Sequence, residues 1–193
     1  MIDRYTRPEM AAIWSEERRL AIWLEIEVLA AEAMAERGEV PKDAIPKLRA
    51  LPPVDISRMR EIEKTTQHEV IAFLSAMAEV GGDPVRWLHV GLTSSDIMDT
   101  AFAVQCKEAA DLLLADLDAL LRVLRDQAER WKTTPTIGRT HGIHAEPITF
   151  GLKIASWYAE FRRDRERLAQ ARNDVAHGTL SGAVGTFSHT HPD

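Results

Sequence analysis

Residues 138–151 read Gly-Arg-Thr-His-Gly-Ile-His-Ala-Glu-Pro-Ile-Thr-Phe-Gly and separate two long stretches that have a helical pattern. Three glycines and a proline interrupt regular helix here, beside two histidines, an arginine and a glutamate. Helix packing alone does not require so many polar and turn-forming residues in one place. An imidazole flanked by a cation and a carboxylate can be tuned for proton transfer near neutral pH. We therefore interpret this segment as a candidate site.

The flanking stretches, about 96–131 and 147–177, each repeat apolar residues in steps of three and four, and Gly178 follows the second. The first would be on the order of 50 Å long at about 1.5 Å per residue. A helix with so wide an apolar stripe needs several neighbours, as in a helical bundle. The apolar positions are Met98, Phe102, Cys106, Ala110, Leu113, Leu117, Leu120 and Leu124 in the first, and Ile154, Trp157, Tyr158, Phe161, Leu168 and Val175 in the second.

Shorter helical patterns fill the region before residue 95. One starts near Ser15 and stops at Gly38, and Pro41 and Asp55 open two more. The sequence of residues 6–9, Thr-Arg-Pro-Glu, fits a capping box. We find no β-strand pattern of useful length. The sequence therefore predicts an all-α chain with an N-terminal helical domain over 1–95 and the start of a long-helix bundle over 96–193.

The composition excludes several classes of protein. The net charge of −6 provides no general footprint for nucleic acid, so a local cluster of cations would have to hold any anionic ligand. The single cysteine, Cys106, excludes an internal disulfide framework and fits a reducing compartment. Neither a signal peptide nor a run of about 18 apolar residues is present, so we expect no membrane span and a cytoplasmic location.

Polar loops precede several helices. Residues 64–69 read Lys-Thr-Thr-Gln-His-Glu, and residues 89–96 read His-Val-Gly-Leu-Thr-Ser-Ser-Asp. Such loops either cap a helix or use its free N–H groups to bind an anion. The first loop leaves both interpretations open, whereas three hydroxyls beside a histidine favour an anion site in the second. Arg4 and Tyr5 precede the first helix, and their position near the terminus favours a solvent-exposed tail without a specific role.

Other chemistries lack a supporting motif. His141 and His144 are three residues apart, but Gly142 and Pro147 disfavour a regular helix that would aim both rings at one ion, and His189 and His191 have no carboxylate at a recognised offset. Glycine-rich nucleotide loops and a serine nucleophile elbow are also missing. We therefore expect no metal. The hydroxyls, imidazoles and guanidinium groups of the loops suit an anionic substrate and acid–base catalysis.

Four segments together resemble the adenylosuccinate lyase family, within the fumarase/aspartase superfamily. They are residues 4–10, 65–69, 91–96 and 139–147, in the family's order and at its approximate spacing, so the resemblance covers the whole chain. The resemblance implies a cofactor-free β-elimination that releases fumarate. Its substrates would be adenylosuccinate, which gives AMP, and the succinylated aminoimidazole carboxamide ribonucleotide of purine synthesis.

The resemblance also implies roles for individual residues. His141 would be the general acid that protonates the departing nitrogen, with His68 either supporting it or lying near the phosphate. Glu69 stands where many relatives have aspartate. The implied substrate-binding residues are Arg4 and Tyr5 for the nucleotide, Gln67, His68 and Glu69 along the pocket, and Thr93 and Ser94 for the succinyl carboxylate, with His89 beside them.

The family is more than twice as long as this chain, and its catalytic base is a serine on a glycine-rich loop beyond residue 193. The resemblance thus implies an N-terminal portion with little or no activity by itself. It also implies a homotetramer in which three subunits build each site. Two alternatives stay open: a superfamily lyase acting on another succinylated or carboxylated substrate, and a non-catalytic helical interaction module.

Overall fold

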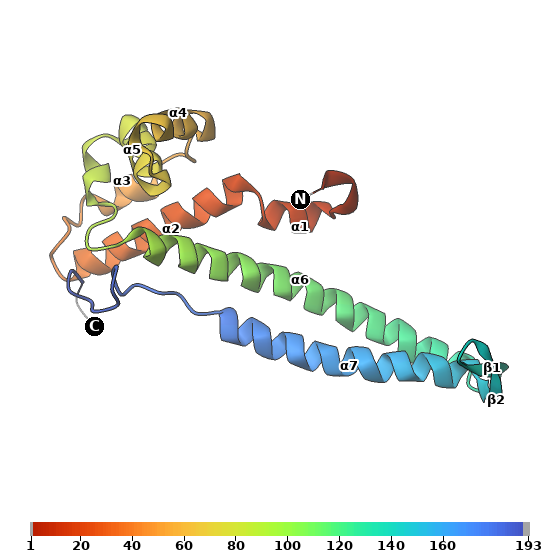
Figure 1. The fold of residues 1–193 in the computed structure, drawn as a ribbon. Helices are drawn as coiled ribbons and strands as arrows, with labels where there is room; N and C mark the ends of the chain where they lie inside the picture. The colour runs from red at the N-terminus through yellow and green to blue at the C-terminus, as the bar shows by residue number, and fades with distance from the viewer. Residues whose placement is uncertain (1, 191–193) are drawn as a thin grey trace. The chain divides into compact units, whose positions relative to one another are not determined.

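The computed structural model describes residues 2–190, which form helices and one two-stranded sheet (Figure 1). The predicted all-α class is confirmed, because helices make up almost all of the regular structure. In chain order the elements are η1 (Asp3–Tyr5), α1 (Pro8–Ile13), α2 (Glu16–Glu36), α3 (Ile45–Arg49), α4 (Ile56–Thr66), α5 (Glu69–Gly81), η2 (Asp83–Trp87), α6 (Ser94–Arg130), β1 (Pro135–Thr140), β2 (Ile143–Thr149) and α7 (Phe150–Val175).

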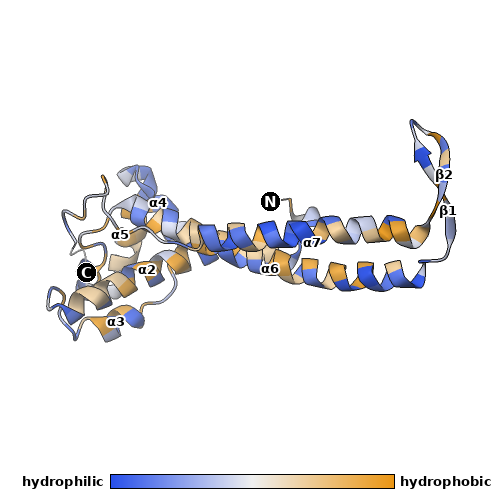
Figure 2. Ribbon diagram, turned by 90° about the horizontal axis from the view of Figure 1, so that it is seen from below, coloured by the Kyte–Doolittle hydropathy of each residue, from blue (hydrophilic) through white to orange (hydrophobic). Residues whose placement is uncertain are grey.

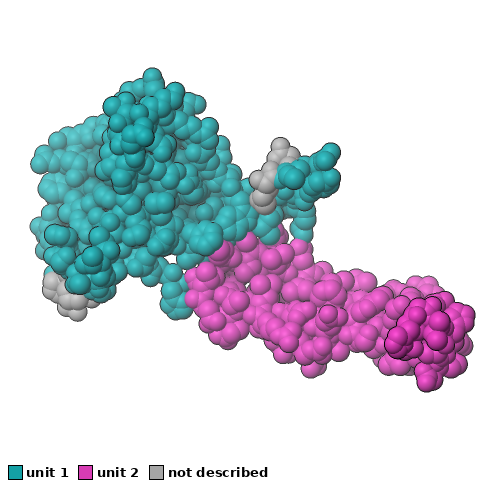
Figure 3. Space-filling view, viewed as in Figure 1, with its two compact units in different colours: residues 1–105, 177–193 teal, residues 106–176 magenta. Residues whose placement is uncertain are grey.

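The chain forms two compact units (Figure 3). Unit 1 consists of residues 1–105 together with 177–193, and unit 2 consists of residues 106–176. Helix α6 contributes its first turns to unit 1 and the remainder to unit 2. The proposed division of the chain into domains at residue 95 stays a prediction.

Unit 1 has its hydrophobic core among α2, α4, α5 and the first turns of α6. Trp23 of α2 and Phe73 of α5 are at most 1% exposed, and their rings meet edge to face with centroids 5.6 Å apart. Ile97 of α6 is fully buried in the same cluster. Burying side chains of this size stabilises each by about 1.5–3 kcal/mol relative to exposure, which fixes α2, α5 and the start of α6 as a frame for the loops between them.

Side chains cap several helices of unit 1 as expected. Ser15 Oγ accepts a hydrogen bond from Arg18 N at 3.0 Å, and Asp55 Oδ1 accepts one from Arg58 N at 3.1 Å. The capping box predicted at residues 6–9 is wrong. Thr6 Oγ1 instead donates to the carbonyl of Ile2 at 2.9 Å, and no side chain caps α1.

Unit 2 contains a β-hairpin between its two long helices, so the expectation that no strand is present is wrong. Strands β1 and β2 pair antiparallel around the two-residue turn His141-Gly142. Both turn residues have positive φ, 50° and 76°, which is the conformation that matches the twist of a tight hairpin. Gly142 makes the turn, and the register shifts between Ile137 and Arg139 at a bulge.

The hairpin delays the second long helix. Helix α7 begins at Phe150 rather than near Pro147, and Thr149 Oγ1 caps it by accepting from Leu152 N at 3.1 Å. Hydrophobic and hydrophilic residues alternate along both α6 and α7 (Figure 2). Two arginines of α7 bind aspartates of α6: Arg165 contacts Asp118 and Arg172 contacts Asp111, each through two hydrogen bonds.

No helix in the described part of the chain combines the length and the apolar character needed to cross a membrane.

Candidate functional site

His68 joins two of the polar loops of unit 1. The residue is the N-cap of α5, where its Nδ1 accepts a hydrogen bond from Ile71 N at 3.3 Å. An acceptor nitrogen carries no proton, so the neutral ring must hold its proton on Nε2. That nitrogen lies 3.4 Å from Ser94 Oγ, to which it can donate. The predicted loops 64–69 and 89–96 therefore meet through a neutral imidazole and a hydroxyl.

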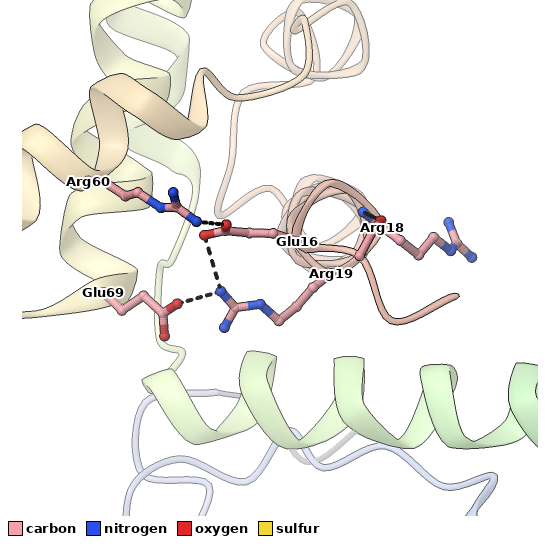
Figure 4. A network of polar contacts seen from close by, with 6 residues as sticks. Glu16, Arg18, Arg19, Arg60 and Glu69 are labelled. Carbon is pink, nitrogen blue, oxygen red and sulfur yellow. Dashed lines mark hydrogen bonds and ion pairs between the residues drawn. The ribbon is translucent and has the colours of Figure 1, made fainter. Parts of the chain in front are cut away.

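Gln67 and Glu69, on either side of His68, already have partners within unit 1. Gln67 ends α4 in the left-handed conformation, with φ at 53°, and its amide donates to the carbonyl of Lys64 at 2.8 Å. Glu69 Oε1 accepts from Arg19 Nη2 of α2 at 2.6 Å (Figure 4). Glu16 bridges Arg19 and Arg60 in the same network (Figure 4). The Glu69 carboxylate thus connects the start of α5 to α2.

His89 is held by a buried carboxylate that the sequence analysis did not single out. Glu27 of α2 is 1% exposed, and its Oε2 accepts from His89 N at 2.6 Å. The other oxygen, Oε1, lies 2.7 Å from His89 Nδ1. Glu27 lies seven residues after Leu20, on the buried face of α2. A charged residue within this apolar stripe is the sequence feature that could have identified Glu27.

Asp96 organises the loop that contains Thr93 and Ser94. The carboxylate is 1% exposed and accepts from Thr93 N at 3.0 Å, which ties the loop to the first turn of α6. It also accepts from Ser181 N at 3.0 Å and Gly182 N at 3.2 Å. The motif at the start of α6 thus contains one structural anchor, Asp96, beside the half-buried Thr93 and Ser94.

His141 occupies the tip of the hairpin in unit 2. Its side chain is exposed, and no hydrogen bond or ion pair joins the imidazole to another residue of the described chain. Histidine is one of the few side chains that adopt positive φ with some frequency, which permits this placement. The hairpin therefore presents the ring to solvent.

Arg4 and Tyr5 lie in η1, and both side chains are exposed. The Arg4 guanidinium stacks over the Tyr5 ring, 4.8 Å from its centroid. This pair places a cationic and an aromatic side chain together at the exposed end of the chain.

No group of three or more His, Cys, Asp or Glu side chains within residues 2–190 is arranged to hold a metal ion. His191, which the sequence analysis considered with His189, lies outside the described residues.

A family model described as Lyase matches residues 3–193. The chain belongs to this lyase family. Two curated relatives support the resemblance seen in the sequence. Adenylosuccinate lyase of Bacillus subtilis (strain 168) is 48% identical over 192 residues, and adenylosuccinate lyase of Streptococcus mutans serotype c is 50% identical over 192 residues. Each match covers 100% of this chain but only 44% of the relative, so the chain spans less than half the length of either.

Solved structures confirm the expected fold of the chain. A 3-carboxy-cis,cis-muconate lactonizing enzyme from Pseudomonas putida matches with a TM-score of 0.90 and 33% identity, over 98% of this chain and 45% of that one. A fumarate lyase from Mesorhizobium sp. BNC1 matches with a TM-score of 0.86 and 30% identity, over 93% and 43%.

Proposed function

We propose that this chain forms part of an adenylosuccinate lyase, which eliminates fumarate from adenylosuccinate to give AMP and from the succinylated aminoimidazole carboxamide ribonucleotide to give its carboxamide. The observation that carries the proposal is the identity of 48–50% to two relatives of that name along the whole chain. In the elimination, a base removes a proton from the carbon beside a carboxylate, the C–N bond breaks and an acid protonates the departing nitrogen.

The residues of this chain would supply the acid and much of the binding surface. We assign the general acid to His141, because an exposed imidazole with no internal partner is available to a substrate. Thr93 and Ser94 would bind the succinyl carboxylate through their hydroxyls, with His68 and His89 beside them. Gln67 and Glu69 would line the pocket, and Arg4 with Tyr5 would hold the nucleotide.

The proposed enzyme is a cytoplasmic homotetramer whose sites draw residues from three subunits, so that the isolated chain has little or no activity. Exposed apolar side chains on α6 and α7 support the assembly, since soluble monomers rarely leave so many uncovered along two helices. They include Leu113, Val123, Leu152 and Trp157, which are 41–59% exposed. Light scattering of the product of the complete open reading frame would measure its oligomeric state.

The decisive experiment follows fumarate release by ultraviolet absorbance, with the product of the complete open reading frame and adenylosuccinate as substrate. We expect turnover in the wild type, its loss in His141→Ala, and no change in Ser156→Ala, which alters an exposed residue of α7 outside the site. Unchanged turnover in His141→Ala would contradict the assignment of the acid. The alternative result is a wild type that shows no turnover and binds AMP no more tightly than other nucleotides. That result would favour a lyase of the superfamily with another substrate, or a non-catalytic helical module.

A further inference from the structure

Glu27 is a buried carboxylate in an apolar environment. Its side chain is fully inaccessible, and its helical neighbours on α2 include the core residues Trp23 and Val28. No lysine or arginine of residues 2–190 forms an ion pair with Glu27, whose partner is His89. Burying a carboxylate is costly, and apolar residues of similar volume often stabilise a core as well or better. Stability is therefore a weak explanation for a glutamate at this position.

The two oxygens of Glu27 bind two different groups of the same residue. Oε2 accepts from the backbone N–H of His89 at 2.6 Å, and Oε1 lies 2.7 Å from Nδ1 of its ring. His89 has φ at 62°, a left-handed conformation that costs a non-glycine residue about 1 kcal/mol or more and persists only where the surroundings impose it. The pair of bonds fixes both the backbone and the direction of the imidazole.

This geometry also determines which ring nitrogen is free. An ionised carboxylate only accepts hydrogen bonds, so Nδ1 must donate its proton to Oε1. Nε2 is then the nitrogen left for a ligand, and no other residue of the described chain bonds to it. A histidine oriented by a carboxylate through one nitrogen and working through the other is a recurring arrangement in enzyme sites.

We infer that Glu27 is a positioning residue, which holds His89 in one tautomer and directs Nε2 toward an anionic group of the substrate. The inference rests on the proposed function for the identity of that ligand, because His89 precedes the loop of Thr93 and Ser94. When the ring binds an anion as the imidazolium, the Glu27 carboxylate balances the charge of the ring.

Glutamine at position 27 provides a sharp test. Its amide has one acceptor and one donor, so it can satisfy His89 N–H only with its oxygen and must then donate its NH2 group to Nδ1. Glu27→Gln should therefore move the proton of the neutral ring from Nδ1 to Nε2. Glu27→Asp keeps an acceptor-only group and should keep the proton on Nδ1.

The tautomer can be read from the ring nitrogens in the 193-residue chain labelled with ¹⁵N-histidine, with His89→Asn assigning the signal. We expect Nδ1 to be the protonated nitrogen in the wild type and Nε2 in Glu27→Gln. A proton on Nε2 in the wild type, or the same tautomer in both proteins, would overturn the inference. If Glu27→Gln does not fold, the tautomer of His89 in the wild type still tests whether Glu27 accepts the proton of Nδ1.

Kinetics of the complete protein add a second readout. We expect Glu27→Gln to lower kcat/KM about 10-fold or more, mainly through KM, with partial rescue by Glu27→Asp. A lower unfolding midpoint with unchanged kcat/KM would reduce Glu27 to a structural anchor. A wild type without lyase activity would instead sink the proposed function, and the reversal of the tautomer would still test the positioning role.

Discussion

Nε2 of His68 lies 3.4 Å from Oγ of Ser94, while Nδ1 of the same ring caps α5. One side chain thus has two tasks that use opposite edges of the imidazole. The cap requires an unprotonated Nδ1, so the neutral ring holds its proton on Nε2 and can donate it to Ser94. The two tasks can be separated by substitution.

Replacing His68 by Ala should lower the free energy of unfolding by about 1 kcal/mol, because α5 loses its N-cap acceptor. His68→Asn should preserve most of that stability, since asparagine is a good N-cap, but it removes the ring that contacts Ser94. Urea denaturation of both variants measures the cap, and fumarate release by the complete protein measures the ring. Equal destabilisation in the two variants would show that capping is not the structural role of His68.

Asp96→Asn should destabilise the chain by about 1–3 kcal/mol. The carboxylate accepts from the backbone N–H groups of Thr93, Ser181 and Gly182, and an amide would direct a donor at at least one of them. Asp99→Asn, on the same helix but exposed, is the matched control and should change stability by less than about 0.5 kcal/mol. Equal effects of the two variants on the urea midpoint would contradict the anchoring role.

Acid should weaken unit 2 through the ion pairs between α6 and α7. The hydrogen bonds from Arg165 hold the pKa of the Asp118 carboxyl below its usual value, and those from Arg172 do the same for the pKa of Asp111. A carboxyl with a depressed pKa in the folded state contributes stability above its ordinary pKa, about 3.9, and loses it as the pH falls through the folded value. The expected loss is modest because both pairs are partly exposed.

The measurement is the urea midpoint between about pH 6 and pH 2, where aspartates titrate. The double variant Asp111→Asn/Asp118→Asn should show a shallower decline below about pH 4 than the wild type. Asp126→Asn is the control, because that residue pairs only with its neighbour Arg125 among the ion pairs of the described chain. A decline as steep in the double variant as in the wild type would show that these pairs do not contribute.

Gly151→Ala should destabilise the chain, although alanine in a helix is normally more stable than glycine by about 1 kcal/mol. A Cβ at position 151 would lie 2.5 Å from the carbonyl oxygen of Ala128 and 2.6 Å from Cα of Lys132, both backbone atoms. The start of α7 would have to move away from the end of α6, with a cost of about 1–3 kcal/mol. Thermal unfolding gives the sign directly, and a raised midpoint would contradict the close packing.

The apolar periodicity predicted the two long helices because apolar residues repeat with the helical turn, even where side chains such as Phe102 and Leu113 are exposed in this structure. The N-termini of α2 and α4, at Ser15 and Asp55, could also be predicted from the sequence. A capping side chain and its N–H partner are only three residues apart, so the cap is a local pattern. The hairpin was missed for the opposite reason. Its glycines and prolines resemble loop formers until the turn at His141 and Gly142 brings two short strands into register.

The sequence also predicted part of the candidate site, and the tertiary structure supplied the rest. The sequence by itself determined which loops carry imidazoles and hydroxyls, including His68, His89 and Ser94, because residue type and order along the chain suffice for that. Only the tertiary structure decided that His68 meets Ser94 and that Glu27 holds His89, 62 residues away in the sequence. Contacts between distant segments depend on how the helices pack, and no local pattern encodes which buried carboxylate will face which ring.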